Sequence, residues 1–369
     1  MLSYRKKRII LQLIPFGVIP GIFSIIYSLI EKGILGNHPI YPSTGNPYSF
    51  QLLIPATISM LAGFLLGILE IFYINKWFQK SSFIKKLIFK FIIYLFTVIV
   101  ASIVITFTMY ALELGINPFN VQVWNVITTF YSNLFSWSLT LYFTMAILIC
   151  VFYMEVSDNI GQAVFLNLFR GKYHQPIEEE RIFMFLDMKS STAIAEQLGH
   201  VKYFKMLKDF YLHLSDPIIE YGGEIYQYVG DEIVITWKLK KGSAHNSLHC
   251  FFAMKQALQN QAKKFQSNYG LVPTFKAAIH YGKVTTGEIG VIKKEIIFSG
   301  DVLNTTARIQ SLCNTYKVDL LTSEKFVKTL EKNETFNAVE IGEVALKGRN
   351  KKINLYTLKK QGEKQITVE

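Results

Sequence analysis

RIFMFLDMKSST, residues 181–192, joins an apolar run to a short polar segment. The run has the composition and length of a buried strand, and Asp187 stands at its end. Apolar residues at helical spacing begin just after it, so we expect a helix to start near Ser190. Because the first N–H groups of a helix attract phosphate, Ser191 and Thr192 become candidate phosphate contacts.

A second acidic residue follows the next predicted hairpin. GEIYQYVGDEIVITW, residues 223–237, predicts two strands around a tight turn at Gly230, with Asp231 directly after it. If neighbouring strands bring Asp187 and Asp231 to one end of a sheet, the pair can hold two divalent cations about 3.5–4 Å apart. In-line phosphoryl chemistry requires such a pair of cations.

The rest of the C-terminal half alternates helices and strands. The pattern predicts helices over 190–214 and 243–265, a strand at KAAIHYG (276–282), a ribbon over 283–298 and a helix over 302–313. Short strands follow as far as Leu358. This order predicts a ferredoxin-like α+β sandwich with additions.

Asn304 and Arg308 are four residues apart on one predicted helix, so they share a face. An Asn amide can orient a sugar, and the planar fork of Arg can meet charge on a phosphorane. Each residue alone has an ordinary explanation, because an Asp at a strand end usually caps a helix and a helical Arg is usually solvated. The order and spacing of the two aspartates, the asparagine and the arginine together favour a catalytic role.

Four segments of this half resemble the motifs of class III adenylate/guanylate cyclases. FLDMKSST (185–192) is similar to the first metal-binding motif and YVGDEI (228–233) to the second. IHYGKVTTGEIG (279–290) is similar to the glycine-bearing segment after the fourth strand, and SGDVLNTTARI (299–309) to the transition-state motif. The resemblance extends from about Arg181 to Leu358 with the motifs in order, which is more specific than any single motif.

The resemblance implies a reaction and a role for each residue. ATP would be converted to 3′,5′-cyclic AMP and pyrophosphate at two sites of a homodimer, each with two Mg²⁺ or Mn²⁺ ions. Asp187 and Asp231 would bind these ions together with the backbone carbonyl of Met188. Asn304 would orient the ribose and Arg308 would stabilise the transition state, both from the opposite subunit.

The residues expected at the base and the triphosphate fit the family less closely. Lys347 in ALKGR matches the lysine that contacts the triphosphate. Gln227 stands where adenylate cyclases typically have Lys and guanylate cyclases Glu, and Ile297 stands where the base partner is Asp or Thr. A Gln amide can serve adenine or, flipped, guanine, whereas Ile297 can do neither. ATP is favoured because the acidic residue of the guanylate pattern is absent; GTP stays open.

The N-terminal half has the composition of a membrane domain. A spanning helix needs about 20 apolar residues, and four stretches qualify: Ile9–Leu29, Leu52–Ile74, Phe91–Leu112 and Asn133–Met154. We therefore expect an α-helical membrane domain of four transmembrane helices over 1–154, a linker or transducer helix over 155–180, and the cyclase domain over 181–369. A cleaved signal peptide is the rival for the first span, but its apolar run is too long and lacks a small-residue cleavage site.

Loop charge predicts the orientation of the spans, because cytoplasmic loops retain Lys and Arg. The N-terminal Arg5–Arg8 cluster and the Lys76–Lys90 loop are basic, whereas Glu31–Phe50 has only Lys32 and Glu113–Ser132 has no Lys or Arg. Both termini are therefore expected on the cytoplasmic side of the plasma or inner membrane. Since these basic clusters flank apolar runs, they account for the net charge of +12 without nucleic acid as a partner.

One glutamate within a predicted span and the three cysteines need separate interpretation. Glu70 lies inside the second span, where a carboxylate is a functional candidate, although snorkelling toward Lys76 is the preferred explanation. Cys150, Cys250 and Cys313 have neither metal-site nor disulfide spacing, so we expect three packed thiols.

Two other functions remain open. Gly222–Tyr226 is superficially similar to the signature of diguanylate cyclases, but its acidic and aromatic residues do not fit. A membrane receptor whose cyclase-like domain binds nucleotide without turnover is the non-enzymatic alternative. Cyclic nucleotide production by the 180–369 fragment separates these readings.

Overall fold

The computed structural model describes residues 3–35, 48–78, 81–114, 117, 120–330, 336–346 and 352–360. Contacts divide the chain into two units. One unit comprises residues 6–160, and the other comprises residues 161–369 with residues 1–5. The predicted boundaries at 154 and 180 stay predictions.

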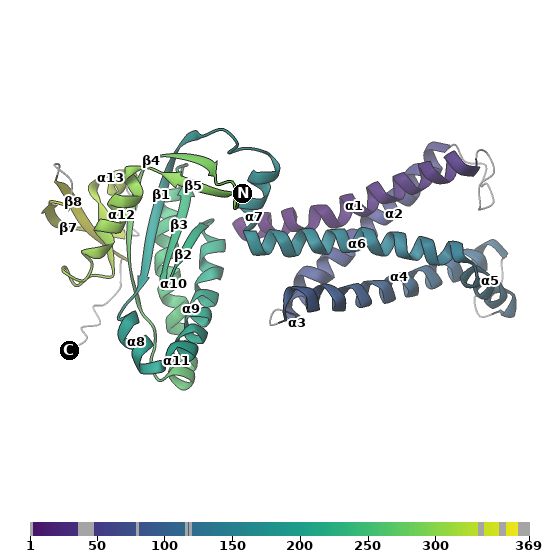
Figure 1. The fold of residues 1–369 in the computed structure, drawn as a ribbon, viewed down its shortest axis with the longest axis horizontal. Coiled ribbons are helices and arrows are strands. Elements are labelled where there is room, and N and C mark those ends of the chain that lie inside the picture. Colours follow the sequence, from purple (N-terminus) through teal and green to yellow (C-terminus); the bar gives the residue numbers. More distant parts are fainter. Residues whose placement is uncertain are drawn as a thin grey trace. The chain divides into compact units, whose positions relative to one another are not determined.

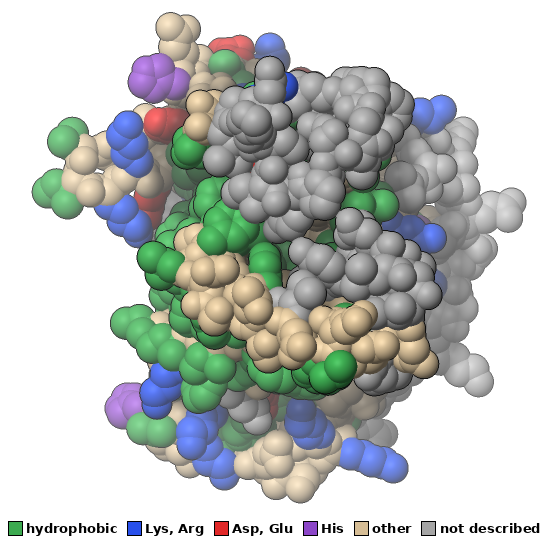
Figure 2. Space-filling view, turned by 90° about the vertical axis from the view of Figure 1, so that its right-hand side faces the viewer, with side chains coloured by type: hydrophobic (Ala, Val, Ile, Leu, Met, Phe, Trp, Pro, Cys, Tyr) green, Lys and Arg blue, Asp and Glu red, His purple; other side chains and the backbone are tan. Residues whose placement is uncertain are grey.

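The helical unit contains four helices that are long and apolar enough to cross a membrane, as predicted (Figure 1). These segments are Tyr4–Ile34, Leu52–Trp77, Phe83–Ile105 and Leu134–Ile160. The elements are α1 (Tyr4–Leu35), α2 (Tyr48–Leu69), the π-helical turn η1 (Glu70–Ile74), α3 (Asn75–Trp77), α4 (Phe83–Leu114), α5 (Val121–Ser132) and α6 (Leu134–Ile160). Viewed from the end that carries α5, much of the described surface is hydrophobic (Figure 2).

Glycines let α1 and α2 approach each other closely. A Cβ atom added at Gly63 would lie 1.9 Å from the carbonyl oxygen of Phe16, and one at Gly67 would lie 2.8 Å from the Phe16 side chain. Small residues serve this purpose in membranes, where packing rather than the hydrophobic effect holds helices together. The glycines thus fix the α1–α2 contact.

Charged side chains form a buried cluster in the helical unit, which we call the ion cluster: Glu70 on η1, Lys90 on α4 and Glu155 on α6. The Lys90 ammonium lies 2.5 Å from Glu70 and 2.6 Å from Glu155. Tyr94 donates a hydrogen bond to Glu70. The preferred explanation, that Glu70 snorkels toward Lys76, is wrong because Glu70 is 0% exposed and its partners come from α4.

The C-terminal unit is built on one mixed sheet (Figure 1). Its strands are β1 (Ile177–Met188), β2 (Glu224–Val229), β3 (Glu232–Lys238), β4 (Phe275–Ile289), β5 (Glu295–Ser299), β6 (Leu320–Ser323), β7 (Phe336–Val344) and β8 (Ile353–Lys360). Its helices are α7 (Gln162–Phe169), α8 (Ser191–Leu198), α9 (His200–Glu220), α10 (Ser243–Asn260), α11 (Ala262–Tyr269), α12 (Asp301–Ser311) and α13 (Glu324–Val327). The strand order is β2-β3-β1-β4-β6-β8-β7, and β5 pairs with β4.

The first four strands confirm the ferredoxin-like core, since β1 lies between β3 and β4 and helices connect β1 to β2 and β3 to β4. One face of the sheet packs Met184 and Ile235 against α9 and α10. The other face packs Phe183 and Val234 against Val302 of α12. Both faces of β1 are therefore buried, which holds Asp187 at its end in a fixed position.

Two helices are shorter than predicted. The helix expected over 190–214 is divided into α8 and α9 at Gly199, whose φ of 73° breaks the helical path. The helix expected over 243–265 is divided at Gln261, and the chain continues as α11. The three cysteines are free and buried, as expected.

Candidate active site

Asp187 is held at the end of a strand that is buried on both faces. Residues 181–186 of β1 are all buried, and Asp187 is paired with Glu232 of β3 on one side and Lys276 of β4 on the other. The Asp187 side chain is 24% exposed, and its Oδ2 atom lies 3.3 Å from the Lys276 ammonium. The carboxylate is thus fixed by the sheet and still open to solvent.

Asp231 is placed by the tight turn between β2 and β3. Gly230 has a φ of 62°, which an L-residue with a side chain adopts at a cost. From α9, the Tyr211 hydroxyl donates to the Gly230 carbonyl at 3.0 Å and lies 3.3 Å from the Glu232 carbonyl. Tyr211 therefore ties the turn to the neighbouring helix and limits the movement of Asp231.

The carboxylates at this end of the sheet repel one another. Burial contributes most to raising the pKa of Asp187, and the neighbouring Asp231 raises it further, while Gln310 and Lys276 lower it. The pKa of Glu232 is raised by burial and then by Asp187 and Asp231. A divalent cation fits between Asp187 and Asp231, because its charge would offset this repulsion. The described residues contain no group of three or more acidic, His or Cys side chains that could hold a metal.

Helix α12 carries Asn304 and Arg308 on the side turned away from the sheet. Its buried side comprises Val302, Thr305, Thr306, Ile309 and Gln310. Gln310 lies beside Asp187, whereas Asn304 is exposed and Arg308 is half-buried. Within one chain, the structure therefore brings together Asp187 and Asp231 but turns Asn304 and Arg308 away from them.

Residues 173–360, just over half of the chain, match the family of the adenylate and guanylate cyclase catalytic domain. The chain belongs to this family. Similar relatives are adenylate cyclase 2 of Rhizobium meliloti (strain 1021), 36% identical over 209 residues, and the adenylate cyclase of Anabaena cylindrica, 29% identical over 182 residues. The alignments cover 56% and 48% of this chain and 58% and 36% of those relatives.

A solved structure supports the fold of the cyclase domain. The structure of a bacterial light-regulated adenylyl cyclase matches with a TM-score of 0.52 and 18% sequence identity, covering 62% of this chain and 66% of that one. At this identity the likeness concerns the fold alone.

The residues predicted to read the base lie on separate strands of the cyclase domain. Gln227 on β2 is exposed and pairs with Val234. Ile297 on β5 is half-buried and pairs with Gly287. Their neighbours Tyr226 and Phe298 meet with ring centroids 4.9 Å apart, a contact that the sequence did not suggest.

The predicted phosphate contacts lie at the start of α8. Ser190 adopts a left-handed conformation with a φ of 55°, after which Ser191 is half-buried and Thr192 is exposed. Lys347, predicted at the triphosphate, lies outside the described residues. Lys276, Gln310 and Tyr211 were missed by sequence reasoning. The sequence offered one signal for the first of these residues: Lys276 is a charged residue in the otherwise apolar predicted strand KAAIHYG.

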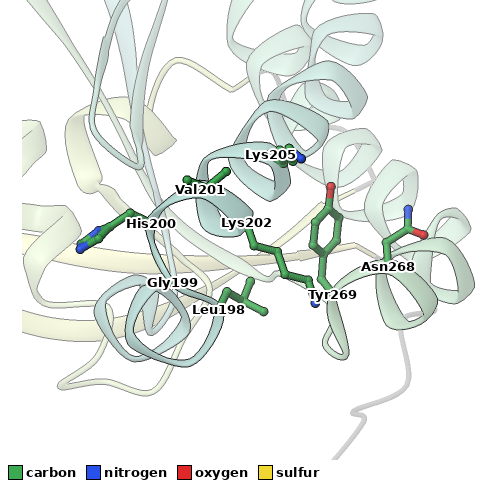
Figure 3. Close-up of a pocket in the computed structure, with 8 residues that line it drawn as sticks. All are labelled: Leu198, Gly199, His200, Val201, Lys202, Lys205, Asn268 and Tyr269. Atoms are coloured by element: carbon green, nitrogen blue, oxygen red, sulfur yellow. The ribbon is translucent and has the colours of Figure 1, made fainter.

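A separate pocket of about 610 Å³ lies where α8, α9 and α11 meet (Figure 3). Its lining residues are Leu198, Gly199, His200, Val201, Lys202, Lys205, Asn268 and Tyr269. None of the predicted site residues is among them. Its basic side chains, His200, Lys202 and Lys205, are all exposed.

Proposed function

We propose that this chain is a membrane-bound adenylate cyclase that converts ATP to 3′,5′-cyclic AMP and pyrophosphate. The observation that carries the proposal is the Asp187–Asp231 carboxylate pair at the sheet end of a cyclase-family domain. ATP rather than GTP is favoured because Gln227 replaces the acidic residue typical of guanylate cyclases. The names of the two relatives, both adenylate cyclases, agree with this choice.

Two Mg²⁺ or Mn²⁺ ions per site fit the repelling carboxylates. Asp187, Asp231 and the Met188 carbonyl would hold them. When bound, such ions supply Lewis-acid chemistry that activates the ribose 3′-hydroxyl and offsets the charge of the phosphates. The N–H groups around Ser191 and Thr192 would receive phosphate oxygens at the start of α8.

The remaining roles fall to Asn304 and Arg308 of α12 and to Lys347. Asn304 would orient the ribose, and Arg308 would donate to the oxygens of the α-phosphorus as charge develops there. Lys347 would hold the outer phosphates. Each residue binds or orients the nucleotide, which places the 3′-oxygen in line with the leaving pyrophosphate.

A homodimer would complete each site. Asn304 and Arg308 face away from the sheet that holds Asp187, so a partner sheet is needed to bring carboxylates opposite them. This geometry supports sites shared between two copies of the chain, related by a twofold axis.

We further propose that the four apolar helices span the membrane with both termini in the cytoplasm. The basic N-terminus and the basic segment that contains Lys76, Lys85 and Lys86 support this orientation. Reporter tags at both termini should then read cytoplasm, and a tag within residues 36–45 should read the outside. A C-terminal tag outside would refute the arrangement, because the carboxylate pair would be separated from cellular ATP.

The decisive test is turnover by purified full-length protein with ATP or GTP and either Mg²⁺ or Mn²⁺. Cyclic AMP should form, and Asp187→Ala or Asp231→Ala should each reduce it to background. Asp216→Ala, which removes an exposed carboxylate from α9, is the matched control and should retain activity. Cyclic GMP as the main product would replace ATP with GTP. Lack of any product would favour a nucleotide-binding receptor.

A further inference from the structure

An aromatic contact joins two strands of the cyclase domain that are not neighbours in the sheet. Tyr226 of β2 and Phe298 of β5 meet edge to face, with ring centroids 4.9 Å apart and ring planes at 67°. The Phe298 N–H group donates to the Tyr226 hydroxyl at 3.4 Å. Strands β3 and β1 separate β2 from β4, and β5 pairs with β4. The two rings therefore bridge the sheet on its α12 face, where Phe298 also meets Phe183 at 5.6 Å.

A bulge in β2 brings Tyr226 into this contact. The pairing of β2 with β3 shifts register between Ile225 and Gln227, so Tyr226 is the extra residue of the bulge. A β-bulge re-aims the side chains beside it. Here the Tyr226 ring packs in the cluster under α12, whereas the next residue, Gln227, is exposed. The contact thus holds β2 at the residue before the expected reader of the base.

Arg181 supports the contact from β1. Its side chain is 1% exposed, and its guanidinium carbon lies 4.6 Å from the centre of the Phe298 ring. A cation over an aromatic face attracts the ring, more strongly where water is excluded. The same guanidinium donates to a carboxylate oxygen of Glu224, at the start of β2, at 2.9 Å. Arg181 therefore holds β5 through Phe298 and β2 through Glu224.

Hydrogen bonding alone leaves the choice of base open. The Gln227 amide can serve adenine or, flipped, guanine, and the Ile297 side chain offers no hydrogen bond. Gln227 directly follows Tyr226, and Ile297 directly precedes Phe298. Because the two rings touch, any shift of one ring against the other changes the distance between the two residues expected to read the base.

We propose that the Tyr226–Phe298 contact, supported by Arg181, is a positioning device that selects the base. It sets the distance between Gln227 and Ile297. The inference rests on the proposed function, in which these two residues flank the purine. A spacing held constant accepts one orientation of the purine against the Gln227 amide, so selectivity between ATP and GTP depends on the rings as well as on the amide.

The test is the affinity of purified full-length protein for non-hydrolysable analogues of ATP and GTP, measured by calorimetry. Phe298→Ala should reduce the preference for the ATP analogue by about tenfold, within the range over which apolar contacts discriminate. Phe298→Tyr keeps the ring and should stay within about twofold of the wild type. Phe336→Ala is the matched control, since it removes a half-buried ring stacked on Phe252 at the other edge of the sheet. It should leave the preference unchanged.

Turnover adds a second readout. Phe298→Ala should raise the KM for ATP by about fivefold or more and leave kcat within about twofold, because the rings act on the base and not on the reacting phosphate. Arg181→Met removes the cation over the ring and should shift the analogue preference in the same direction. A lower kcat with unchanged KM in Phe298→Ala would contradict the inference.

Thermal unfolding identifies variants that do not fold. If Phe298→Ala folds and weakens both analogues equally, the contact is structural only and the inference is wrong. If Phe298→Ala does not fold, Tyr226→Ala replaces it, because Tyr226 is half-buried on an edge strand. If neither alanine variant folds while Phe298→Tyr does, the rings serve the fold alone, which also overturns the inference.

The wild type separates this inference from the proposed function. Cyclic AMP production with an unchanged analogue preference in Phe298→Ala would overturn the positioning role alone. A wild type that prefers the GTP analogue would overturn the ATP assignment, while a preference that collapses in Phe298→Ala would still support the role of the rings.

Discussion

The hydroxyl group of Tyr211 positions the turn that bears Asp231. Tyr211→Phe removes its hydrogen bond to the Gly230 carbonyl while keeping the ring contact with Tyr228 at 4.7 Å. We expect a loss of about 1 kcal/mol in stability and a lower kcat, because Asp231 gains freedom. Thermal unfolding and turnover measure the two effects. Tyr228→Phe, at a 49% exposed side chain, should change neither, and equal losses in both variants would contradict the role of Tyr211.

Glu179 makes the stability of the cyclase domain depend on pH. Burial alone would raise its pKa, but hydrogen bonds from Lys238, Arg181 and Lys172 outweigh this effect and hold the pKa at about 2, against an ordinary value of 4.5. Since the folded pKa is depressed, the stabilisation is complete above about pH 4.5 and is lost as the pH falls toward 2.

Glu179→Gln tests this dependence. The variant should be less stable than the wild type by about 3 kcal/mol at pH 7, and the difference should shrink as the pH falls from about 5 to 3. Chemical unfolding of the full chain across this range gives the comparison. A difference that stays constant with pH would mean that the carboxylate charge of Glu179 is not the cause.

At the scale of elements, the ion cluster connects three helices of the helical unit. Removing one partner of a buried ion pair typically costs about 3–5 kcal/mol, because the remaining charge is left unpaired. Lys90→Met should therefore destabilise the unit by about this amount, measured as thermal unfolding in detergent. Lys86→Met is the control, since Lys86 is partly exposed and lies 3.5 Å from Glu155. Similar losses of stability in both variants would indicate that the buried ion pairs of Lys90 are not the cause.

The elements also explain which parts of the structure could be predicted. The strand of Asp187 and the turn of Asp231 followed from local signals, an apolar run and a glycine, and both are confirmed. The partner of Glu70 could not be predicted, because it depends on how α4 is rotated against η1. For the same reason, the contact of Lys276 with Asp187 required the register of β1 and β4.

Whole-molecule behaviour should reveal whether two copies share each site. Mixing Asp187→Ala with Arg308→Ala places both defects in one site of the heterodimer and leaves the other intact. With random pairing, activity should recover to about a quarter of the wild type, although neither variant alone exceeds background. Cyclic nucleotide assays on co-expressed, co-purified subunits provide the readout. Silence in such a sample would indicate sites built within one chain or strongly coupled sites.

The ion cluster also bears on how the protein is made. A lone charge inside a membrane helix raises its insertion free energy, by about 2.5–3.5 kcal/mol at the helix centre and by less toward its ends. Glu70 and Lys90 occur on consecutive apolar helices, and their charges neutralise each other. Both residues precede Glu155 in the sequence, so both are synthesised before it. The two helices can enter the bilayer as a neutral hairpin, and α6 then joins through Glu155. The order of translation thus favours an order of assembly in which the last helix to arrive closes the bundle.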